Sequence, residues 1–256
     1  MGYFAARSAP LGMVAPEVVS AIFYNFAPQR VAKALPAAWQ IAGPEAALRA
    51  RQDSAVAALR RYGLAEDANV VVAAELAGRA ARQAPLDGRP LFAANLALPW
   101  PDDPLAGLWH AATLLREQRG DAHVAVLTAA DVSGRESNVL HAAAGRVPRD
   151  YIARTRDYDE AAWRHHEQRL AERGLLNDDG SLSETGRELK DSIESRTDAL
   201  SLSALDALSD DEVETLFQAL TPITRAVIAA GDVPAVTPMD LRRNELSDGS
   251  AHLGLD

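Results

Sequence analysis

Residues 159–193 read DEAAWRHHEQRLAERGLLNDDGSLSETGRELKDSI, and this stretch decides the fold class of the chain. Asp159 is a good N-cap for a helix over Glu160–Arg173, and Gly174 stands where such a helix ends. The segment Leu175–Leu182 places two short apolar arms around an Asp-Gly turn, which predicts a hairpin. After the hairpin the helical pattern resumes. The stretch therefore predicts a helix, a small β-wing and a second helix.

Apolar residues recur with the period of an α-helix along most of the chain, and Ala, the strongest helix former, dominates the apolar set. The other expected helices are Pro16–Phe26, Gln29–Ala38, Glu45–Tyr62, Asn69–Arg82, Leu105–Gln118, Asp121–Ala129, Arg135–Ala144, Tyr151–Arg154, Glu184–Leu200 and Asp210–Ala230, and Leu91–Leu98 is a short apolar segment. Gly120 is expected to end one helix, and Asp121 to cap the next one. The sequence thus predicts a mainly α fold in which the wing is the only β structure.

The Pro- and Asp-rich stretch Pro99–Pro104 is the clearest break in the chain and predicts a domain boundary. We expect an N-terminal helical unit over residues 1–98, a C-terminal winged-helix unit over 105–230, and a disordered tail over 231–256. Glu-Ala-Ala opens a helix at residue 45 and again at residue 160, and Gly-Leu follows each of these helices. This likeness leaves two alternatives open, a tandem duplication of a winged-helix-like unit or chance in an Ala-rich chain.

The stretch 159–193 resembles the distal half of a winged-helix domain of the MarR type, in which a recognition helix leads into a wing and a Thr-x-x-Gly stretch opens the next helix. Residues 183–186, Ser-Glu-Thr-Gly, stand in the place of that opening. The whole chain is also similar to a family of largely uncharacterised actinobacterial proteins with a helix-turn-helix label, through residues 23–26 and 114–123. The first resemblance implies a DNA-binding regulator. The second implies a fold and leaves the activity open, and we expect a homodimer formed through terminal helices.

The charge of the chain argues against nucleic acid as a partner. The formal net charge is −10 and the isoelectric point is near 5.1. Between Asn177 and Thr215 the chain has 12 acidic and 3 basic residues. Such a surface repels a polyanion unless a local basic patch overrides it. A MarR-like transcriptional regulator therefore stays the alternative rather than the first hypothesis.

Small-molecule binding on a repurposed winged-helix scaffold is the first hypothesis, with the ligand held between the two units. The protein would act either as a sensor or as an enzyme of specialised metabolism, and whether it is an enzyme is left open. The candidate ligand contacts are polar or aromatic side chains next to apolar segments: Tyr24, Asn25, Trp109, Arg116, Arg119 and Trp163. Arg116 and Arg119 could clamp a carboxylate or phosphate with paired hydrogen bonds. The alternative for every member of this set is structural, as a helix cap, a core residue or a helix junction.

His123 is the candidate general base, with Asp121 as the residue that orients it. If Asp121 caps a new helix, His123 lies in its first turn, where the helix dipole keeps the imidazole neutral. The alternative is a capped helix junction without catalytic function. The adjacent His165 and His166 point in different directions on a helix, and no metal or cofactor is expected.

The chain has no Cys, which excludes disulfides, thiolate catalysis and cysteine-based metal sites. It also lacks glycine-rich nucleotide-binding loops and the Gly-x-Ser-x-Gly motif of serine hydrolases. No segment reaches the roughly 18–20 apolar residues of a membrane span, so we expect a cytoplasmic protein without a membrane partner.

Overall fold

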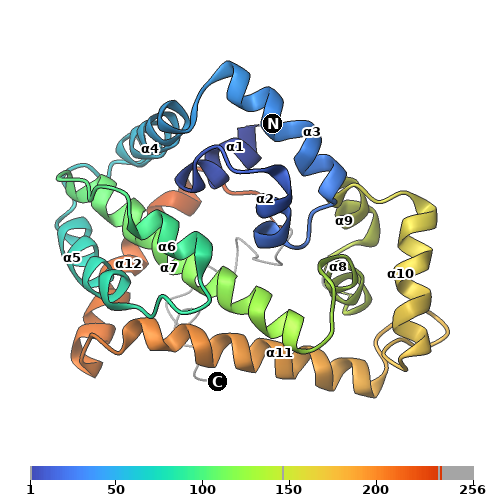
Figure 1. Cartoon of the computed structure of the whole chain (residues 1–256). Helices are drawn as coiled ribbons and strands as arrows, with labels where there is room; N and C mark the ends of the chain where they lie inside the picture. The colour runs from blue at the N-terminus through green and yellow to red at the C-terminus, as the bar shows by residue number, and fades with distance from the viewer. Residues whose placement is uncertain (1, 146, 236, 238–256) are drawn as a thin grey trace. The chain divides into compact units, whose positions relative to one another are not determined.

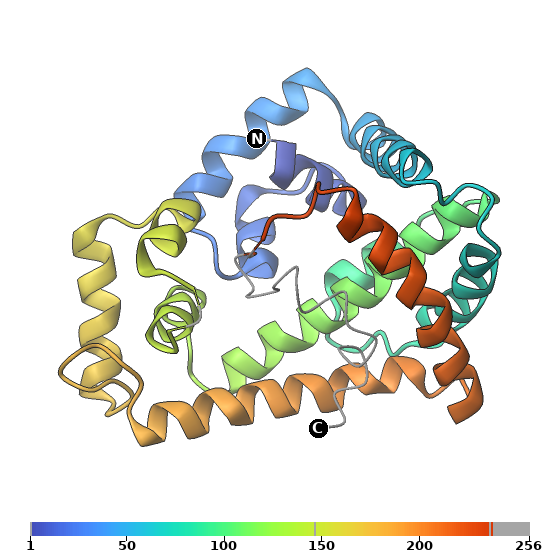
Figure 2. The same cartoon turned by 180° about the vertical axis from the view of Figure 1, so that it is seen from behind.

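The computed structural model of the chain describes residues 2–145, 147–235 and 237 (Figures 1 and 2). These residues are mostly helical and form no β-strand. They fall into two compact units, in which segments from different parts of the chain alternate. Unit 1 consists of Met1–Pro44 and Arg119–Ser201, and unit 2 of Glu45–Gln118 and Leu202–Asp256.

Unit 1 combines the N-terminal helices with the helices around residues 134–202. Its elements are α1 (Gly2–Ser8), the short 3-10 helix η1 (Ala9–Leu11), α2 (Pro16–Phe23), α3 (Pro28–Ile41), the last part of α7 (Pro104–Ala129), α8 (Gly134–Ala143), α9 (Arg149–Arg156), α10 (Glu160–Glu172) and α11 (Glu184–Leu202). Helix α3 packs against α1 and α2, and α8 packs against α9 and α10 (Figure 1). A hydrophobic cluster that includes Val139, Ile152, Trp163, Leu170 and Ile193 forms the core beneath α8–α10.

Unit 2 is built around α5 and the first part of α7. Besides the first part of α7, its elements are α4 (Pro44–Arg61), α5 (Ala68–Gln83), α6 (Pro90–Leu96), the 3-10 helix η2 (Ser203–Leu205) and α12 (Asp210–Ala229). Helices α5 and α12 lie side by side in both views (Figures 1 and 2). Their shared core contains Val70, Ala73, Leu76, Leu216 and Ile223. Apolar residues at helical spacing therefore pair these two helices, as the periodicity predicts.

The predicted ends of α10 are confirmed. The carboxylate of Asp159 accepts a hydrogen bond from the backbone N–H of Ala162 at 2.7 Å and caps the helix. At the other end Gly174 has φ +71°, and the N–H of Leu175 donates to the carbonyl of Leu170 at 3.0 Å. Glycine suits this left-handed position because it has no Cβ, and the N–H bond satisfies a free carbonyl of the last turn.

The structure corrects the predicted β-wing. Among the described residues a single antiparallel bridge, between Leu176 and Leu182, stands in place of two strands. The N–H of Asn177 donates to the carbonyl of Ser181 at 2.9 Å and closes the turn. The hydroxyl of Ser183 accepts from the N–H of Gly186 at 3.0 Å, which starts α11 directly after the bridge. Each arm is therefore too short to form a ladder.

The predicted helix break at Gly120 is wrong, because α7 continues from Pro104 to Ala129 without interruption. A glycine inside a helix costs only about 1 kcal/mol relative to Ala. Burial of neighbouring side chains such as Leu114 and Ala122, which are 0% and 3% exposed, offsets that cost. Helix α3 contains Pro36 and extends to Ile41, beyond the predicted end at Ala38.

The domain boundary expected at residues 99–104 does not coincide with a change of unit. Division into separately folding domains stays a prediction. The tandem duplication is not supported: the segment after α10 carries the bridge between Leu176 and Leu182, and no such bridge follows α4 among the described residues. Of the expected tail over 231–256, residues 236 and 238–256 lie outside the described residues. Within the described ranges no helix has the length and apolar character needed to cross a membrane.

Candidate functional site

Helices α9 and α10 are joined by a turn of three residues, Asp157, Tyr158 and Asp159. Asp157 takes a left-handed conformation with φ +62°, and the N–H of Tyr158 donates to the carbonyl of Ala153 at 3.0 Å, which ends α9. The Asp159 cap then starts α10 at once. Two helices connected by a turn of about three residues are the defining element of a helix-turn-helix motif.

The side chain of Tyr158 ties this turn to α8. Its hydroxyl donates to the carbonyl of Arg135 at 2.6 Å and accepts from the amide of Asn138 at 3.1 Å. The guanidinium of Arg135 lies 3.3 Å from the centre of the Tyr158 ring and donates to the carbonyl of Arg156 at 2.7 Å. Burial raises the pKa of Tyr158, so its hydroxyl stays protonated and able to donate at neutral pH.

Helix α10 has one buried and one exposed face. Trp163 is 2% exposed, and Leu170 is 0% exposed in the unit 1 core. Arg164, His165 and Gln168 are exposed. These three positions share one side of the helix. In a helix-turn-helix protein this outward side of the second helix is the one that faces the bases. Trp163, a predicted ligand contact, instead occupies the core, and its ligand role stays a prediction.

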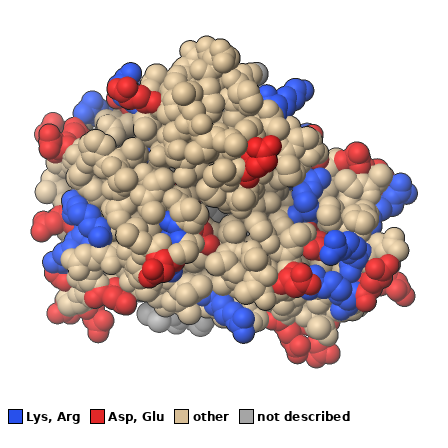
Figure 3. All heavy atoms as spheres, viewed as in Figure 1, with Lys and Arg blue, Asp and Glu red and all other residues tan. Residues whose placement is uncertain are grey.

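The arginines at α10 have carboxylates close by. Glu160 lies 2.8 Å from Arg149 and 3.9 Å from Arg164, measured between ion-pair atoms. Arg169 approaches the buried carboxylate of Glu136 at 3.2 Å. On the face seen in Figure 3, Lys and Arg side chains around α9 and α10 are interspersed with Asp and Glu and form no unbroken positive strip. The positive charges of the exposed arginines are therefore largely offset by nearby carboxylates.

This balance still sets residues 134–174, which contain the turn between α9 and α10, apart from the rest of the chain. Residues 134–174 contain eight Arg and seven Asp or Glu, whereas the whole chain has 26 basic and 36 acidic residues. The turn after α10 is negative at its tip, where Asp178 and Asp179 are exposed. Hydrogen bonds from Ser181 lower the pKa of Asp179, which keeps its charge. Hence α10 is compatible with a polyanion, whereas the tip of the turn is not.

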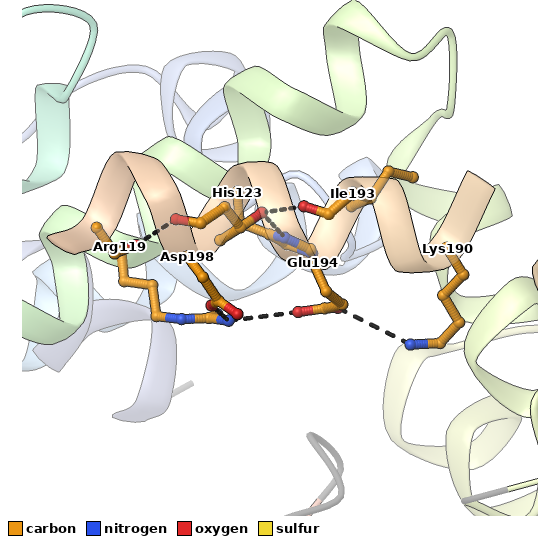
Figure 4. A network of polar contacts seen from close by, with 8 residues as sticks. Arg119, His123, Lys190, Ile193, Glu194 and Asp198 are labelled. Atoms are coloured by element: carbon orange, nitrogen blue, oxygen red, sulfur yellow. Dashed lines mark hydrogen bonds and ion pairs between the residues drawn. The ribbon is translucent and has the colours of Figure 1, made fainter. Parts of the chain in front are cut away.

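Figure 4 shows where the predicted base, His123, lies. Its Nδ1 is 3.0 Å from the hydroxyl of Thr197, which itself donates to the carbonyl of Ile193 at 2.7 Å. The hydroxyl must therefore accept from Nδ1–H, which leaves the lone pair on Nε2. Thr197 therefore orients this ring. Burial is the main cause that lowers the pKa of His123. The sequence predicts that the dipole at the start of a new helix keeps the ring neutral, but no helix starts at Asp121, because α7 is continuous there. The general-base role of His123 and Asp121 stays a prediction.

Arg119 joins α7 to α11 within unit 1. Its guanidinium lies 2.8 Å from Asp198 and 3.3 Å from Glu194, and Glu194 also lies 3.9 Å from the ammonium of Lys190 (Figure 4). The group predicted to clamp a ligand anion thus binds carboxylates of the chain itself. This geometry matches the structural alternative, and ligand binding by Arg119 stays a prediction.

Tyr24 and Asn25 form a strained turn at the end of α2. Tyr24 has φ +48°, and the N–H of Asn25 donates to the carbonyl two residues earlier at 2.6 Å. Such γ-turns with positive φ are rare and cost energy. The Tyr24 hydroxyl donates to the carbonyl of Val132 at 2.7 Å, and Asn138 donates to the carbonyl of Asn25 at 2.9 Å. A Cβ at Gly134 would lie 2.0 Å from the Tyr24 carbonyl oxygen, so only Gly fits there. The two residues cap α2 and hold it to α8, and their ligand role stays a prediction.

Unit 2 contains a polar cluster on α4, α6 and α7. Arg51 donates to the side chain of Asn95 at 2.9 Å, and its guanidinium lies 5.3 Å from the ring centre of Trp109. Trp109 is a predicted ligand contact, and the group that lies over its ring is the guanidinium of Arg51. Its ligand role stays a prediction. Arg116, another predicted contact, binds the 2% exposed carboxylate of its neighbour Glu117 at 2.5 Å. Burial lowers the pKa of Arg51, and the charge of Glu117 partly opposes that effect.

His110 on α7 also belongs to this cluster, and the sequence did not single it out as a ligand contact. It is 3% exposed, and its buried Nε2 has no hydrogen-bond partner in the described part of the chain. Its ring packs edge-on against Trp100 at 4.9 Å, and Arg82 covers the same indole at 3.8 Å. Burial, followed by the charges of Arg51 and Arg82, lowers the pKa of His110 to about 4. The described residues contain no group of three or more acidic or histidine side chains that could hold a metal ion.

Comparison with known proteins gives one match. A family model described as a helix-turn-helix family matches residues 1–234. No curated protein and no solved structure matches the chain. The matched range reaches from α1 to beyond α12 and so covers all the described helices.

Proposed function

Because the chain belongs to the helix-turn-helix family, we propose that it binds double-stranded DNA, with α10 in the major groove. The observation that carries this proposal is the exposed face of α10 behind a three-residue turn. This function corresponds to the alternative that the sequence left open. A MarR-like mode of binding and a homodimer on a palindromic site remain finer parts of the same proposal.

The side chains on this face suit contacts with base edges. An Arg at position 164 can donate two hydrogen bonds to guanine, and a Gln at position 168 can pair with adenine. Gln168 donates to Glu172 at 2.8 Å, which orients its amide. Arg149 on α9 is the nearest candidate for a phosphate contact, since the first helix of the motif crosses the backbone. Glu160 already pairs with Arg149 and Arg164, so few counterions are released when these arginines contact DNA. The affinity for DNA should therefore fall only slowly as the salt concentration rises.

The test compares two matched arginines. Arg164 and Arg49 are both exposed on helices, and both pair with the Glu four residues earlier in a Glu-Ala-Ala motif. A DNA sequence is first selected from a pool of random duplexes, and its affinity is measured by fluorescence anisotropy at about 50 and 200 mM salt. We expect Arg164→Ala to weaken binding by about tenfold or more and Arg49→Ala to leave it unchanged. Equal effects of both substitutions, or no duplex binding at the lower salt, would contradict the proposal.

Small-molecule binding is the second candidate function. The observation that favours it is the buried polar face of α7 in unit 2, where His110, Glu117 and Gln118 are 3%, 2% and 1% exposed. An apolar core does not need such groups, and burying them costs free energy. A ligand held between the two units and an enzymatic reaction stay predictions.

A further inference from the structure

Four cationic side chains of unit 1 have no carboxylate partner. They come from the start of α3 and the end of α9, and we call them the α3–α9 cations: Arg30, Lys33, Arg154 and Arg156. In the described part of the chain none of the four forms an ion pair with an Asp or a Glu. The arginines of α10 differ from them, because carboxylates lie next to those arginines.

Two of the α3–α9 cations join the two helices. Arg30 donates to the carbonyl of Thr155, in the last turn of α9, at 3.0 Å. The guanidinium of Arg156 lies 4.4 Å from the centre of the Phe26 ring, which comes two residues before α3. Its Nε is buried and has no hydrogen-bond partner among the described residues. Burial, and to a smaller extent the charge of Arg30, lowers the pKa of Arg156. The fold thus brings two positive charges together although neither pairs with a carboxylate.

The other two cations are exposed to solvent. Arg154 also lies in the last turn of α9, and its guanidinium is 5.8 Å from the centre of the Tyr151 ring. Lys33 follows Arg30 by three residues, so both lie on the same side of α3. An anion in solution can therefore reach cationic groups on both helices.

The sequence around these cations is poor in acidic residues. Residues 2–44 contain three Lys or Arg and a single Asp or Glu, Glu17. Asp150 in the first turn of α9 and Asp157 after its end form no ion pair with the α3–α9 cations. The chain as a whole has a net charge of −10. A local excess of positive charge is what such a chain needs in order to approach a polyanion.

We infer that the α3–α9 cations bind phosphates of the DNA backbone next to the bases that α10 contacts. The inference rests on the proposed function, because it adds a second contact with the same duplex. The first helix of a helix-turn-helix motif crosses the backbone, and here three residues separate the last turn of α9 from α10. A duplex carries about one charge per 1.7 Å of its axis, so it can meet cations on two helices at once. Arg binds phosphate with paired hydrogen bonds and Lys as a point charge.

Backbone contacts differ from base contacts in two measurable ways. A phosphate contact carries no sequence information, so its loss weakens binding to every duplex by the same factor. Each phosphate contact also adds about 0.9 to the slope of log affinity against log salt concentration. Arg149 and Arg164 add little to this slope because Glu160 pairs with both. Contacts by Lys33 and Arg154 give a slope of about −2, which is shallow beside about −5 to −9 for six to ten contacts.

The experiment compares the natural chain with the double variant Lys33→Gln/Arg154→Gln. Fluorescence anisotropy measures the affinity for the selected duplex and for a shuffled duplex of the same composition, between about 50 and 200 mM salt. We expect the double variant to bind both duplexes more weakly by the same factor and to lose almost the whole slope of about −2. Over this range the natural chain should therefore lose about tenfold more affinity than the variant. Both side chains are exposed, so the variant should fold, and thermal unfolding checks this.

Arg196→Gln is the matched control for Arg154→Gln. Arg196 is also an exposed helical Arg of unit 1 without an ion pair in the described part of the chain, but α11 carries five Asp or Glu around it. Both substitutions change the net charge by the same amount. Arg154→Gln should reduce the slope by about 0.9, whereas Arg196→Gln should leave it unchanged.

Three results would overturn the inference: an unchanged slope in the double variant, an equal change of slope in the Arg154 and Arg196 variants, or a loss of affinity confined to the selected duplex. Arg164→Ala separates this inference from the proposed function. If Arg164→Ala weakens binding to the selected duplex while the double variant binds like the natural chain, α10 contacts DNA and the inference alone fails. If the natural chain binds neither duplex at the lower salt concentration, the proposed function fails and the inference with it.

Discussion

Helices α4 and α10 begin with the same Glu-Ala-Ala motif and end in the same way, yet they lie in different units and bury different amounts of side chain. After α4, Gly63 has φ +84° and the N–H of Leu64 donates to the carbonyl of Leu59 at 3.3 Å, a cap like that of α10. Val56 is the buried residue of α4, whereas α10 buries Trp163 and Leu170. A turn of three residues joins α9 to α10, whereas α4 follows α3 and precedes α5 in the chain.

Local sequence sets the helix and its cap in both places, whereas tertiary contacts set what each helix can do. Both helices carry an exposed Arg paired with the first Glu of the motif. In α10 that Arg follows the three-residue turn after α9, and the buried side of the helix packs on the unit 1 core. The two helices are therefore a natural matched pair for experiments.

The largest difference between the two helices is expected at the residue that follows the Glu-Ala-Ala motif. Trp163→Ala removes a side chain that is 2% exposed and should lower the free energy of unfolding by about 4 kcal/mol. Leu48, at the same place in α4, is half-buried, and Leu48→Ala should cost about 1 kcal/mol. Urea denaturation of both variants measures the two costs. Similar costs would mean that α4 and α10 are anchored alike, against the burial described above.

A second difference concerns acid, through His110 in unit 2. The folded state lowers the pKa of His110 to about 4 from an ordinary value of 6.5, so unfolding takes up a proton below pH 6.5. The neutral imidazole thus contributes fully above pH 6.5, and about 3 kcal/mol is lost as the pH falls through 4. Denaturation between pH 7 and 4 should therefore show a flatter pH dependence for His110→Phe than for the natural chain.

His123 and His166 in unit 1 also have lowered pKa values, mainly through burial. They act in the same direction, so His110→Phe reduces the slope without abolishing it. An unchanged slope would show that His110 titrates normally in the folded chain.

The smallest effect on the free energy of unfolding is expected at the C-terminal caps, and it should be equal in α4 and α10. Gly63→Ala and Gly174→Ala each place a Cβ on a left-handed residue and should each cost about 1 kcal/mol. Thermal unfolding of the two variants measures these costs. A large cost for only one of them would mean that its cap depends on tertiary contacts and is not a local motif.

The parts of the fold that the sequence predicts correctly depend on near neighbours. Asp159 and Gly174 bound α10 through hydrogen bonds that span a few residues. Gly120 misleads, because it would weaken an isolated helix, but α7 continues through it, and neighbouring side chains are buried. The hairpin pattern gives a turn with one bridge, since the sequence does not tell how soon α11 starts after Ser183.

The candidate sites follow the same rule. The polar cluster at Arg116–His123 has a local pattern, but its arginines bind carboxylates, of which Glu194 and Asp198 come from a distant helix. His110 gives no local signal, because the groups that make it unusual come from α4, α5 and the segment before α7. Only the folded chain brings them together.

The central claim is that α10, and not α4, contacts DNA. The most direct test is to add the selected duplex to the isotope-labelled chain and to follow backbone amide resonances by NMR. The account predicts that the largest changes fall between Ala161 and Gln168 and that residues 45–61 of α4 stay unchanged. Changes centred on α4, or resonances of α10 that do not respond to the duplex, would contradict it.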